Sequence, residues 1–464
     1  MTIASYFPYD PTTGQWMAVN MLDAFFESTQ QVFVLQGYAG TGKTTLLKVV
    51  LDYLEDKDTT CRLMASTGRA ARVLSLKTKR QAATIHSTIY QIDHAKSVIG
   101  EESKTIAFKL KDNSDPLKTV YFIDESSMIA DKTEANTMLL FDDGRFLQHI
   151  FRYAGTRKIV FIGDVAQLPP VNCSFSAALD ADYLRKTYHR EVVSICLTEV
   201  KRQAGECGII HNATLLREQL FSSKIPPLSL DASNWADLEV VPNIWVALSQ
   251  YSNLIRKSGY EQAIMISYSN NGVFYLNSQI RKNLFKTAEP PLQTNEWLLV
   301  VQNNSATGYS NGQHIWLRSF HDRGEMVGSV HLIDAIVEDP GTEKTKEIKL
   351  VYDLIFRKEP NLTLLEEQEF SRDFAIRMKK KGIKSGTDDY MFNLINDKRM
   401  NALRVKFGYA ITCHKSQGGE WPQVFLNLEP VLEKMTREMQ YRWLYTAITR
   451  ACEKLILPQH VMLY

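Results

Sequence analysis

The sequence predicts an α/β protein with two parallel-sheet domains. Apolar, strand-like runs alternate with helical stretches, as in parallel α/β folds, and this alternation occurs twice along the 464 residues. A glycine-rich segment lies between the first run and the helix after it, which is typical of a phosphate-binding loop. The predicted strands of the first domain are Val32–Leu35, Arg62–Ala65, Thr119–Ile123, Lys158–Ile162 and Val192–Leu197, and those of the second are Glu239–Val241, Ala263–Ser267, Val405–Ala410, Val424–Leu428 and Lys454–Leu457.

Two insertions interrupt the predicted sheets. The shorter one, Ile89–Lys118, separates two strands of the first domain, and the alternating residues Lys104–Leu110 within it predict a strand of a β-hairpin. The longer one begins with Glu296–Phe356, where Gly, Asn and Asp separate short strands, which predicts a small β-barrel. Its second part, Thr363–Arg399, is charged and helical. The expected strands of the barrel are Trp297–Val301, His314–Phe320, Ser329–Ile336 and Glu347–Phe356.

Composition and charge exclude several classes of protein. With 44% hydrophobic and 23% charged residues the chain is typical of soluble globular proteins. No stretch approaches the ~20 apolar residues of a membrane span, and the N-terminus lacks a signal pattern, so we expect a cytoplasmic protein with no membrane partner. The six cysteines lack C-x-x-C spacing, which argues against a zinc site or a disulfide framework. Because the net charge is only +2, a nucleic-acid partner would require a local basic surface.

The segment Gly37–Thr44 matches the pattern G-x-x-x-x-G-K-[ST] in full. Its glycines allow successive N–H groups to turn around an anion, and the following helix adds the positive end of its dipole. Lys43 would reach the β- and γ-phosphates, and the Thr44 hydroxyl would bind Mg²⁺. A glycine-rich turn without a ligand is the alternative, but the full pattern between strand and helix favours a nucleoside triphosphate. The residues expected to bind it are Gly37, Gly40, Gly42, Lys43, Thr44 and Thr45.

Two carboxylates, Asp124 and Glu125, follow a predicted strand of the first sheet. The carboxyl ends of parallel strands form the edge at which ligands bind. We expect Asp124 to hold the water shell of Mg²⁺ and Glu125 to orient and deprotonate an attacking water. Taken alone, the pair is interpreted equally well as the beginning of a helix.

Three further polar residues lie near the ends of predicted elements. Gln167, in Gly163–Pro170, would contact the γ-phosphate and the water, although a turn explains the same residues. Arg202 and Arg450 each end a short motif, and the planar, permanently charged guanidinium suits the spread charge of a phosphoryl-transfer transition state. Either arginine alone is more often a surface ion-pair partner, so this prediction depends on their combination.

The ordered set of motifs resembles the superfamily 1 helicases, specifically the RecD-like and Dda-like branch that moves 5′ to 3′. The resemblance covers nearly the whole chain. Besides the phosphate loop and the acidic pair, the matching segments are Thr13–Trp16 (the Q motif), Met64–Ala71 (motif Ia), Thr84–Ser87 (the next DNA-contacting motif), Ser267–Asn270 (a strand-end motif), Tyr409–Gly418 (motif V) and Tyr445–Ala451 (motif VI).

This resemblance implies two RecA-like P-loop domains, a hairpin insertion, and an SH3-like β-barrel inserted together with a helical arm. The implied domains are 1–198 (domain 1A, with hairpin 1B at 89–118), 199–295 with 401–464 (domain 2A) and 296–400 (domain 2B). ATP and Mg²⁺ are the implied cofactors. The implied partners are single-stranded DNA, the junction of single- and double-stranded DNA, and proteins of replication or recombination, with the monomer as the working form.

The resemblance also implies roles for individual residues. Gln15 would recognise adenine, because an amide both donates and accepts hydrogen bonds, while Gly418 and Glu420 would complete the nucleotide site. An exposed Phe108 in the hairpin would stack on the last base pair, each such stack being worth ~1–3 kcal/mol, or it is a core residue of the hairpin. Ser66 departs from the proline that relatives carry, which weakens its expected DNA contact. The expected DNA-binding residues are Ser66, Thr84, His86, Phe108, Tyr268, Asn270, Thr412 and His414, of which Thr84, His86, Thr412 and His414 are alternatively helix caps or partners of buried backbone groups.

The implied function is that of an ATP-dependent DNA helicase. An RNA helicase of the same superfamily stays open, because backbone contacts hardly distinguish the two sugars unless a 2′-OH is recognised. The ATPase motor subunit of a DNA-processing nuclease complex also stays open, although no further carboxylate cluster indicates a cutting site. A nucleotide-gated binding switch is disfavoured, since the chain has no N-K-x-D motif for guanine.

Overall fold

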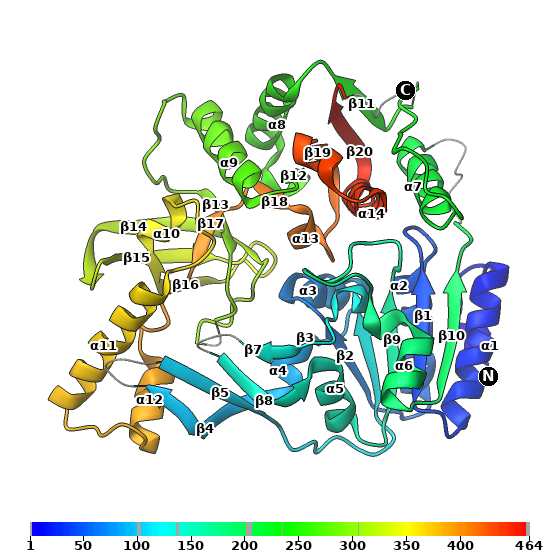
Figure 1. The fold of residues 1–464 in the computed structure, drawn as a ribbon, viewed down its shortest axis with the longest axis horizontal. Coiled ribbons are helices and arrows are strands. Elements are labelled where there is room, and N and C mark those ends of the chain that lie inside the picture. Colours follow the sequence, from blue (N-terminus) through cyan, green and yellow to red (C-terminus); the bar gives the residue numbers. More distant parts are fainter. Residues whose placement is uncertain are drawn as a thin grey trace.

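The computed structural model describes residues 2–99, 104–135, 139–200, 207–233, 235–304 and 306–460. Within these residues two parallel sheets lie next to each other, and an antiparallel sheet with a helical arm extends to one side (Figure 1). We call the parts built on the first and second parallel sheets the first domain and the second domain. None of the described helices is long and apolar enough to cross a membrane.

The first sheet has the order β10-β1-β9-β6-β2-β3, and neighbouring strands are parallel. The central strands are apolar runs buried on both faces, because helices cover the sheet on either side. β1, β6 and β9 therefore end at one edge, at Gly37, Asp124 and Gly163. The strands are β1 (Val32–Gly37), β2 (Cys61–Ala65), β3 (Ala82–Thr84), β6 (Val120–Asp124), β9 (Lys158–Gly163) and β10 (Val192–Leu197).

Side-chain caps fix where the helices of the first domain begin. At the start of α1, the Thr12 hydroxyl accepts from the Gln15 N–H at 3.2 Å, and Gln15 Oε1 accepts from the Thr12 N–H at 3.1 Å. The Thr67 hydroxyl accepts from the Ala70 N–H at 3.1 Å and begins α3 in the same way. The helices are α1 (Thr13–Glu27), α2 (Lys43–Asp56), α3 (Gly68–Thr78), α4 (Ile85–Ile89), α5 (Phe146–Ala154) and α6 (Ala181–Tyr188).

The second sheet has the order β11-β20-β19-β12-β18 and is also parallel. Its strands are β11 (Leu238–Val241), β12 (Ala263–Ser267), β18 (Ala410–Thr412), β19 (Trp421–Leu426) and β20 (Ala451–Pro458). The helices of this domain are α7 (Gly208–Leu220), α8 (Ile244–Ser258), α9 (Asn270–Phe285), α13 (Cys413–Ser416) and α14 (Arg437–Ile448).

The strand predicted at 405–410 is wrong as a single element. Residues Val405–Phe407 form β17 in the antiparallel sheet, whereas β18 begins at Ala410 in the second parallel sheet. The chain changes sheets at Gly408, whose N–H donates to the Trp297 carbonyl at 2.8 Å and whose carbonyl bonds a His314 ring nitrogen at 2.9 Å. Periodicity could not show this change, because both halves are equally apolar.

The antiparallel sheet has the order β16-β15-β14-β13-β17. Its other strands are β13 (Glu296–Val300), β14 (His314–Val327), β15 (Val330–Glu338) and β16 (Thr345–Val351). The last predicted strand ends early, since Tyr352–Phe356 forms helix α10. A bridge between Leu350 and Leu403 connects the far strand β16 to the segment just before β17, so the sheet curls toward closure.

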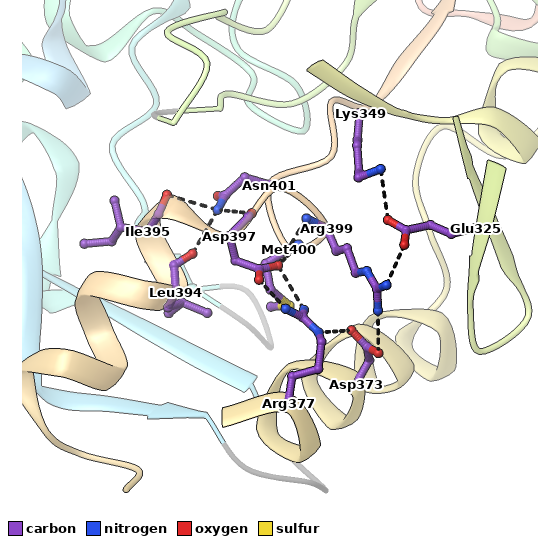
Figure 2. Close-up of polar contacts among 10 residues, drawn as sticks. All are labelled: Glu325, Lys349, Asp373, Arg377, Leu394, Ile395, Asp397, Arg399, Met400 and Asn401. Carbon is purple, nitrogen blue, oxygen red and sulfur yellow. Dashed lines mark hydrogen bonds and ion pairs between the residues drawn. The ribbon is translucent and has the colours of Figure 1, made fainter. Parts of the chain in front are cut away.

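Helices α11 (Leu364–Lys380) and α12 (Asp388–Asn396) form the arm. A chain of alternating charges binds this arm to the antiparallel sheet (Figure 2). Glu325 on β14 pairs with Lys349 at 3.0 Å and with Arg399 at 2.5 Å, which joins two strands to the segment after the arm. The ion-paired chain consists of Lys349, Glu325, Arg399, Asp373, Arg377 and Asp397. Because these side chains are half-buried and share partners, the network stabilises more than isolated surface pairs do.

The hairpin insertion is larger than predicted. β4 (Tyr90–Ile99) and β5 (Lys104–Leu110) are joined by β7 (Thr133–Ala135) and β8 (Leu139–Arg145) in a sheet of the order β4-β5-β8-β7. The charged residues of β8 did not predict a strand. This segment forms a strand because it pairs with β5. Ile92 packs against the core of the arm, which contains Phe370 and Phe374, and α11 lies beside β5 (Figure 1). The hairpin sheet and the arm are therefore in contact.

Candidate functional site

The phosphate loop follows β1 directly and leads into α2. Gly40 and Gly42 have φ of +79° and +82°, a left-handed conformation that favours glycine. At position 42 a side chain would also collide with the first helix, since a Cβ there would lie 2.5 Å from Gln15 Nε2. The Lys43 ammonium donates to the carbonyl oxygens of Gly37 at 2.7 Å and Tyr38 at 3.0 Å, so it lies over the loop.

Gln15 lies against this loop. The side chain is buried, its Nε2 donates to the Thr41 carbonyl at 3.1 Å, and its Oε1 is held by the Thr12 cap. Its orientation is therefore fixed by the loop on one side and the helix start on the other. The amide retains one further N–H and a second lone pair, so its recognition of adenine stays a prediction.

Asp124 and Glu125 follow β6 at the same edge of the sheet. Asp124 Oδ1 accepts from the Glu125 N–H at 2.9 Å. Glu125 has φ of +50°, and a non-glycine residue in this region carries strain of roughly 1–3 kcal/mol, which is common at functional sites. Burial and the negative charge of Asp124 raise the pKa of Glu125 to about 7, although Arg450 and Lys43 oppose the shift. A carboxyl group in this range suits a general base.

Of the predicted metal ligands, Thr44 lies in the first turn of α2 and Asp124 at the end of β6, with β9 between β6 and the strand that leads into the phosphate loop. Among the described residues, no group of three or more His, Cys, Asp or Glu side chains could hold a metal ion. Burial raises the pKa of Asp124, and the positive charge of Lys43 opposes the shift. One hydroxyl and one carboxylate fit Mg²⁺, because this ion takes several of its ligands from phosphate oxygens and water.

The loop after β9 and the second domain complete the site. Gln167 is buried, and no described group bonds its Oε1. Arg450 is buried as well, and within the described residues its hydrogen bonds go to neutral oxygens, those of Thr446 at 3.0 Å, Gly419 at 3.2 Å and Thr449 at 3.1 Å. A buried cation without a carboxylate partner is costly unless an anion compensates it. Its charge lowers the pKa of Glu125, which belongs to the other domain.

Gly418 and Glu420 line the cleft between the domains. Glu420 pairs with Lys77 of α3 at 2.6 Å, and its charge contributes to the raised pKa of Asp124. Gly418 lies against Ala70 at the start of α3. Arg202, the other predicted arginine, lies outside the described residues.

The predicted DNA-binding residues lie in different surroundings. Thr84 caps α4 by accepting from the Ser87 N–H at 3.2 Å, and Thr412 caps α13 through the Lys415 N–H at 3.4 Å. The hydroxyl oxygen of Ser66 is buried and lacks a hydrogen-bond partner among the described residues. The remaining ones are His86, stacked on Phe146, the half-buried Tyr268, the exposed Asn270 and the mostly buried His414, whose pKa is lowered by burial.

Phe108 is not the exposed wedge that one interpretation of the sequence expected. The ring is half-buried and packs against the hydrophobic cluster that contains Ile89 and Phe146. The surroundings therefore match the alternative interpretation, a core residue of the hairpin sheet. A role in separating the strands stays a prediction for the hairpin.

A pocket of about 520 Å³, which the sequence did not predict, lies between the second domain and the part of the chain that contains the antiparallel sheet and α10. Asn270 and Thr412, two predicted DNA-binding residues, share its wall. Burial lowers the pKa of Lys406 to about 8 and also lowers the pKa of Lys415. No local signal exists for this pocket, because it is assembled from α9, α10 and the segment around β18. Its basic and aromatic lining includes Phe274, Lys282, Arg357, Lys358, Lys406 and Lys415.

Fold and site together define a P-loop nucleotide-hydrolysing protein whose second domain contacts the phosphate loop of the first, where the Ala39 N–H donates to the Tyr445 hydroxyl. Residues 12–225 match a family model described as an AAA domain, and residues 407–457 match a model described as a UvrD-like helicase C-terminal domain. The two matches follow the chain order of the two parallel sheets.

Three relatives align along nearly the whole chain. A protein of Acanthamoeba polyphaga mimivirus is 22% identical over 96% of this chain and 98% of its own length. The ATP-dependent DNA helicase dda of Enterobacteria phage T4 is 26% identical over 95% of this chain and 97% of its own length. The ATP-dependent RecD2 DNA helicase of Deinococcus radiodurans is 23% identical over 91% of this chain and 46% of its own length. These matches agree with the resemblance of the chain to superfamily 1 helicases of the Dda-like and RecD-like branch.

Proposed function

We propose that this protein is an ATP-dependent DNA helicase that moves 5′ to 3′ along single-stranded DNA and unwinds the duplex ahead of it. The observation that carries the proposal is Arg450, a buried cation of the second domain whose hydrogen bonds within the described residues go to neutral oxygens and whose charge lowers the pKa of Glu125 in the first domain. Hydrolysis then requires both domains, so the chemistry is tied to their relative movement. Similarity to dda and RecD2 supports DNA as the substrate. The resemblance of the motifs to the Dda-like branch supports this direction of movement.

Each residue of the nucleotide site has a distinct task. Lys43 binds the β- and γ-phosphates, and Gln15 holds the base. Glu125 takes the proton of the attacking water, which the Gln167 amide orients against the γ-phosphate. Arg450, together with Arg202, stabilises the charge that spreads over the transferred phosphoryl group. Mg²⁺ held by Thr44 and Asp124 would neutralise charge on the phosphate oxygens.

Single-stranded DNA would cross both domains on the side of α3, α4 and α13. Ser66 supports this path, because a buried hydroxyl without a partner is expected to bond something that the described residues do not provide. The pocket between the second domain and the antiparallel sheet adds lysines and aromatic rings, which suit a backbone phosphate and an unstacked base. This arrangement supplies the local basic surface that a nearly neutral chain needs.

We assign residues 1–198 to domain 1A, 199–295 with 401–464 to domain 2A, and 296–400 to domain 2B, a SH3-like barrel with its arm. The bridge between Leu350 and Leu403 supports a closed barrel. The ion-paired chain of Figure 2 binds the arm to this barrel, and Ile92 connects the arm to the hairpin sheet. Movement of the second domain would thus reach the hairpin that separates the strands. We further propose that the monomer works in the cytoplasm alongside replication or recombination proteins.

ATP hydrolysis in the presence of matched DNA and RNA oligonucleotides tests this function. We expect single-stranded DNA to stimulate hydrolysis strongly, RNA of the same sequence to stimulate it weakly, and Lys43→Ala to abolish it. Stimulation by RNA alone would instead identify an RNA helicase. Cleavage of DNA by the purified chain would contradict the assignment as a helicase without nuclease activity.

A further inference from the structure

The side of α14 that faces the first domain bonds the loop after β9. Arg442 donates to the carbonyl oxygens of Val165 and Gln167, the latter at 3.2 Å. The Thr446 hydroxyl accepts from the Leu168 N–H at 2.9 Å. These contacts follow the helical spacing of four residues, so one stripe of α14 lies along the loop.

Tyr445, next to this stripe, also reaches the phosphate loop. Its hydroxyl accepts from the Ala39 N–H at 2.9 Å and donates to Asp164 Oδ2 at 2.6 Å. The tyrosine side chain and the Asp164 carboxylate are each 1% exposed. The other carboxylate oxygen, Asp164 Oδ1, accepts from the Ala166 N–H at 2.9 Å. One hydroxyl of the second domain therefore joins the phosphate loop to the strand end beside Glu125.

We propose that Tyr445 is a positioning residue that couples closure of the cleft to hydrolysis, by binding the phosphate loop through Ala39 and the β9 strand end through Asp164 at the same time. The inference rests on the proposed function, since it concerns how bound DNA stimulates the ATPase. Opening of the cleft would withdraw the hydroxyl from both partners at once. A buried carboxylate and a loop N–H would then lose their hydrogen bonds together, which favours two discrete states over a continuous range.

The same geometry explains why the residue must carry a hydroxyl. Burial, and then the charge of Asp164, raise the pKa of Tyr445 well above its ordinary value, so the group stays protonated and can donate. A phenylalanine would fill the same space and would leave the Ala39 N–H and Asp164 Oδ2 without the hydroxyl that they bond. Tyr445 is not expected to touch the reacting atoms, because its hydroxyl is occupied by the loop and the carboxylate.

Tyr445→Phe tests the proposal, with Tyr441→Phe as its matched control. Tyr441 lies one turn earlier on α14, is also buried, and donates to Gln219 of the second domain at 2.7 Å. For each variant we would measure the thermal midpoint, and the kcat and KM for ATP with and without saturating oligo-dT. We expect Tyr445→Phe to lower the DNA-stimulated kcat by roughly 10- to 100-fold, with KM and the DNA-free rate near wild type. Tyr441→Phe should retain stimulation.

A double-mutant cycle with Asp164→Asn separates coupling from independent damage. If the two residues act as one unit, the double variant should be no slower than the slower single variant. The proposal would be overturned if the losses in kcat of the two single variants added up in the double variant, or if Tyr445→Phe kept the DNA-stimulated kcat of the wild type. It would also be overturned if Tyr445→Phe impaired KM, kcat and the thermal midpoint to the same degree. Failure of the proposed function would look different, because the wild-type protein itself would then show no stimulation by DNA.

Discussion

Gly418 of the second domain lies against Ala70 of the first, so closely that a Cβ at position 418 would come within 2.7 Å of the Ala70 Cβ. Ala70 lies in the first turn of α3, where the DNA path is proposed, and Gly418 follows α13. The close contact between the two domains at this point thus depends on the absence of a side chain at position 418. Gly418 has φ of +72°, which is a second reason for glycine there.

Gly418→Ala should hinder closure of the cleft and lower the DNA-stimulated ATPase at least tenfold. Gly382→Ala is the matched control, because Gly382 has the same φ of +72° and, among the described residues, nothing within 4 Å of its added Cβ. Both variants carry the same backbone strain, of roughly 1 kcal/mol. Equal rates in the two variants would show that the contact with Ala70 does not matter for turnover.

The pH dependence of hydrolysis should reveal Glu125. Its pKa is raised to about 7, so the carboxylate that acts as base forms only as the pH rises through that value. We therefore expect kcat/KM for ATP to increase from pH about 6 and to level off above pH about 8. The pH dependence of this ratio reports the ionisation of groups in the free enzyme. The measurement uses saturating Mg²⁺, so that the nucleotide keeps one ionisation state. Glu125→Gln should bind ATP and not hydrolyse it, and a profile that is flat across this range would remove Glu125 as the base.

Arg450→Gln should lower kcat by at least 100-fold while KM for ATP changes little, because transition-state charge exceeds ground-state charge. Arg437→Gln is the control at the beginning of α14, the helix that precedes Arg450, since Arg437 is exposed and donates to the Ile225 carbonyl at 2.9 Å. Steady-state kinetics and a thermal melt of both variants make the comparison. Parallel losses in kcat and affinity would indicate simple phosphate binding by Arg450.

Arg399→Gln should uncouple unwinding from translocation, because Arg399 connects Glu325 of the antiparallel sheet to Asp373 of the arm (Figure 2). We expect the unwinding rate to fall severalfold, with the DNA-stimulated ATPase near wild type. Arg185→Gln, which breaks the exposed pair with Asp182 in the first domain, should leave both unchanged. If the ATPase fell together with unwinding, the ion-paired chain would serve folding and not coupling.

The nucleotide site could be predicted from sequence because each of its motifs is local. Gly37–Thr44 and the Asp124-Glu125 pair carry their geometry in a few adjacent residues, and parallel strands bring them to one edge. The contacts of Tyr445 and the basic pocket could not be predicted, since each joins segments far apart in the chain. The split at Gly408 and the strand β8 were missed for a related reason, because partner strands and not local periodicity decide them.

Unwinding of a fluorescent duplex with either a 5′ or a 3′ single-stranded tail is the most direct test of the proposed helicase activity and of its direction. We expect ATP-dependent separation of the strands only when the tail is 5′, with no separation by Lys43→Ala. Splitting a base pair costs on the order of 1.4 kcal/mol in stacking, so one ATP per step suffices when movement is coupled to the hairpin. Unwinding from 3′ tails, or hydrolysis stimulated by DNA without any unwinding, would contradict this expectation.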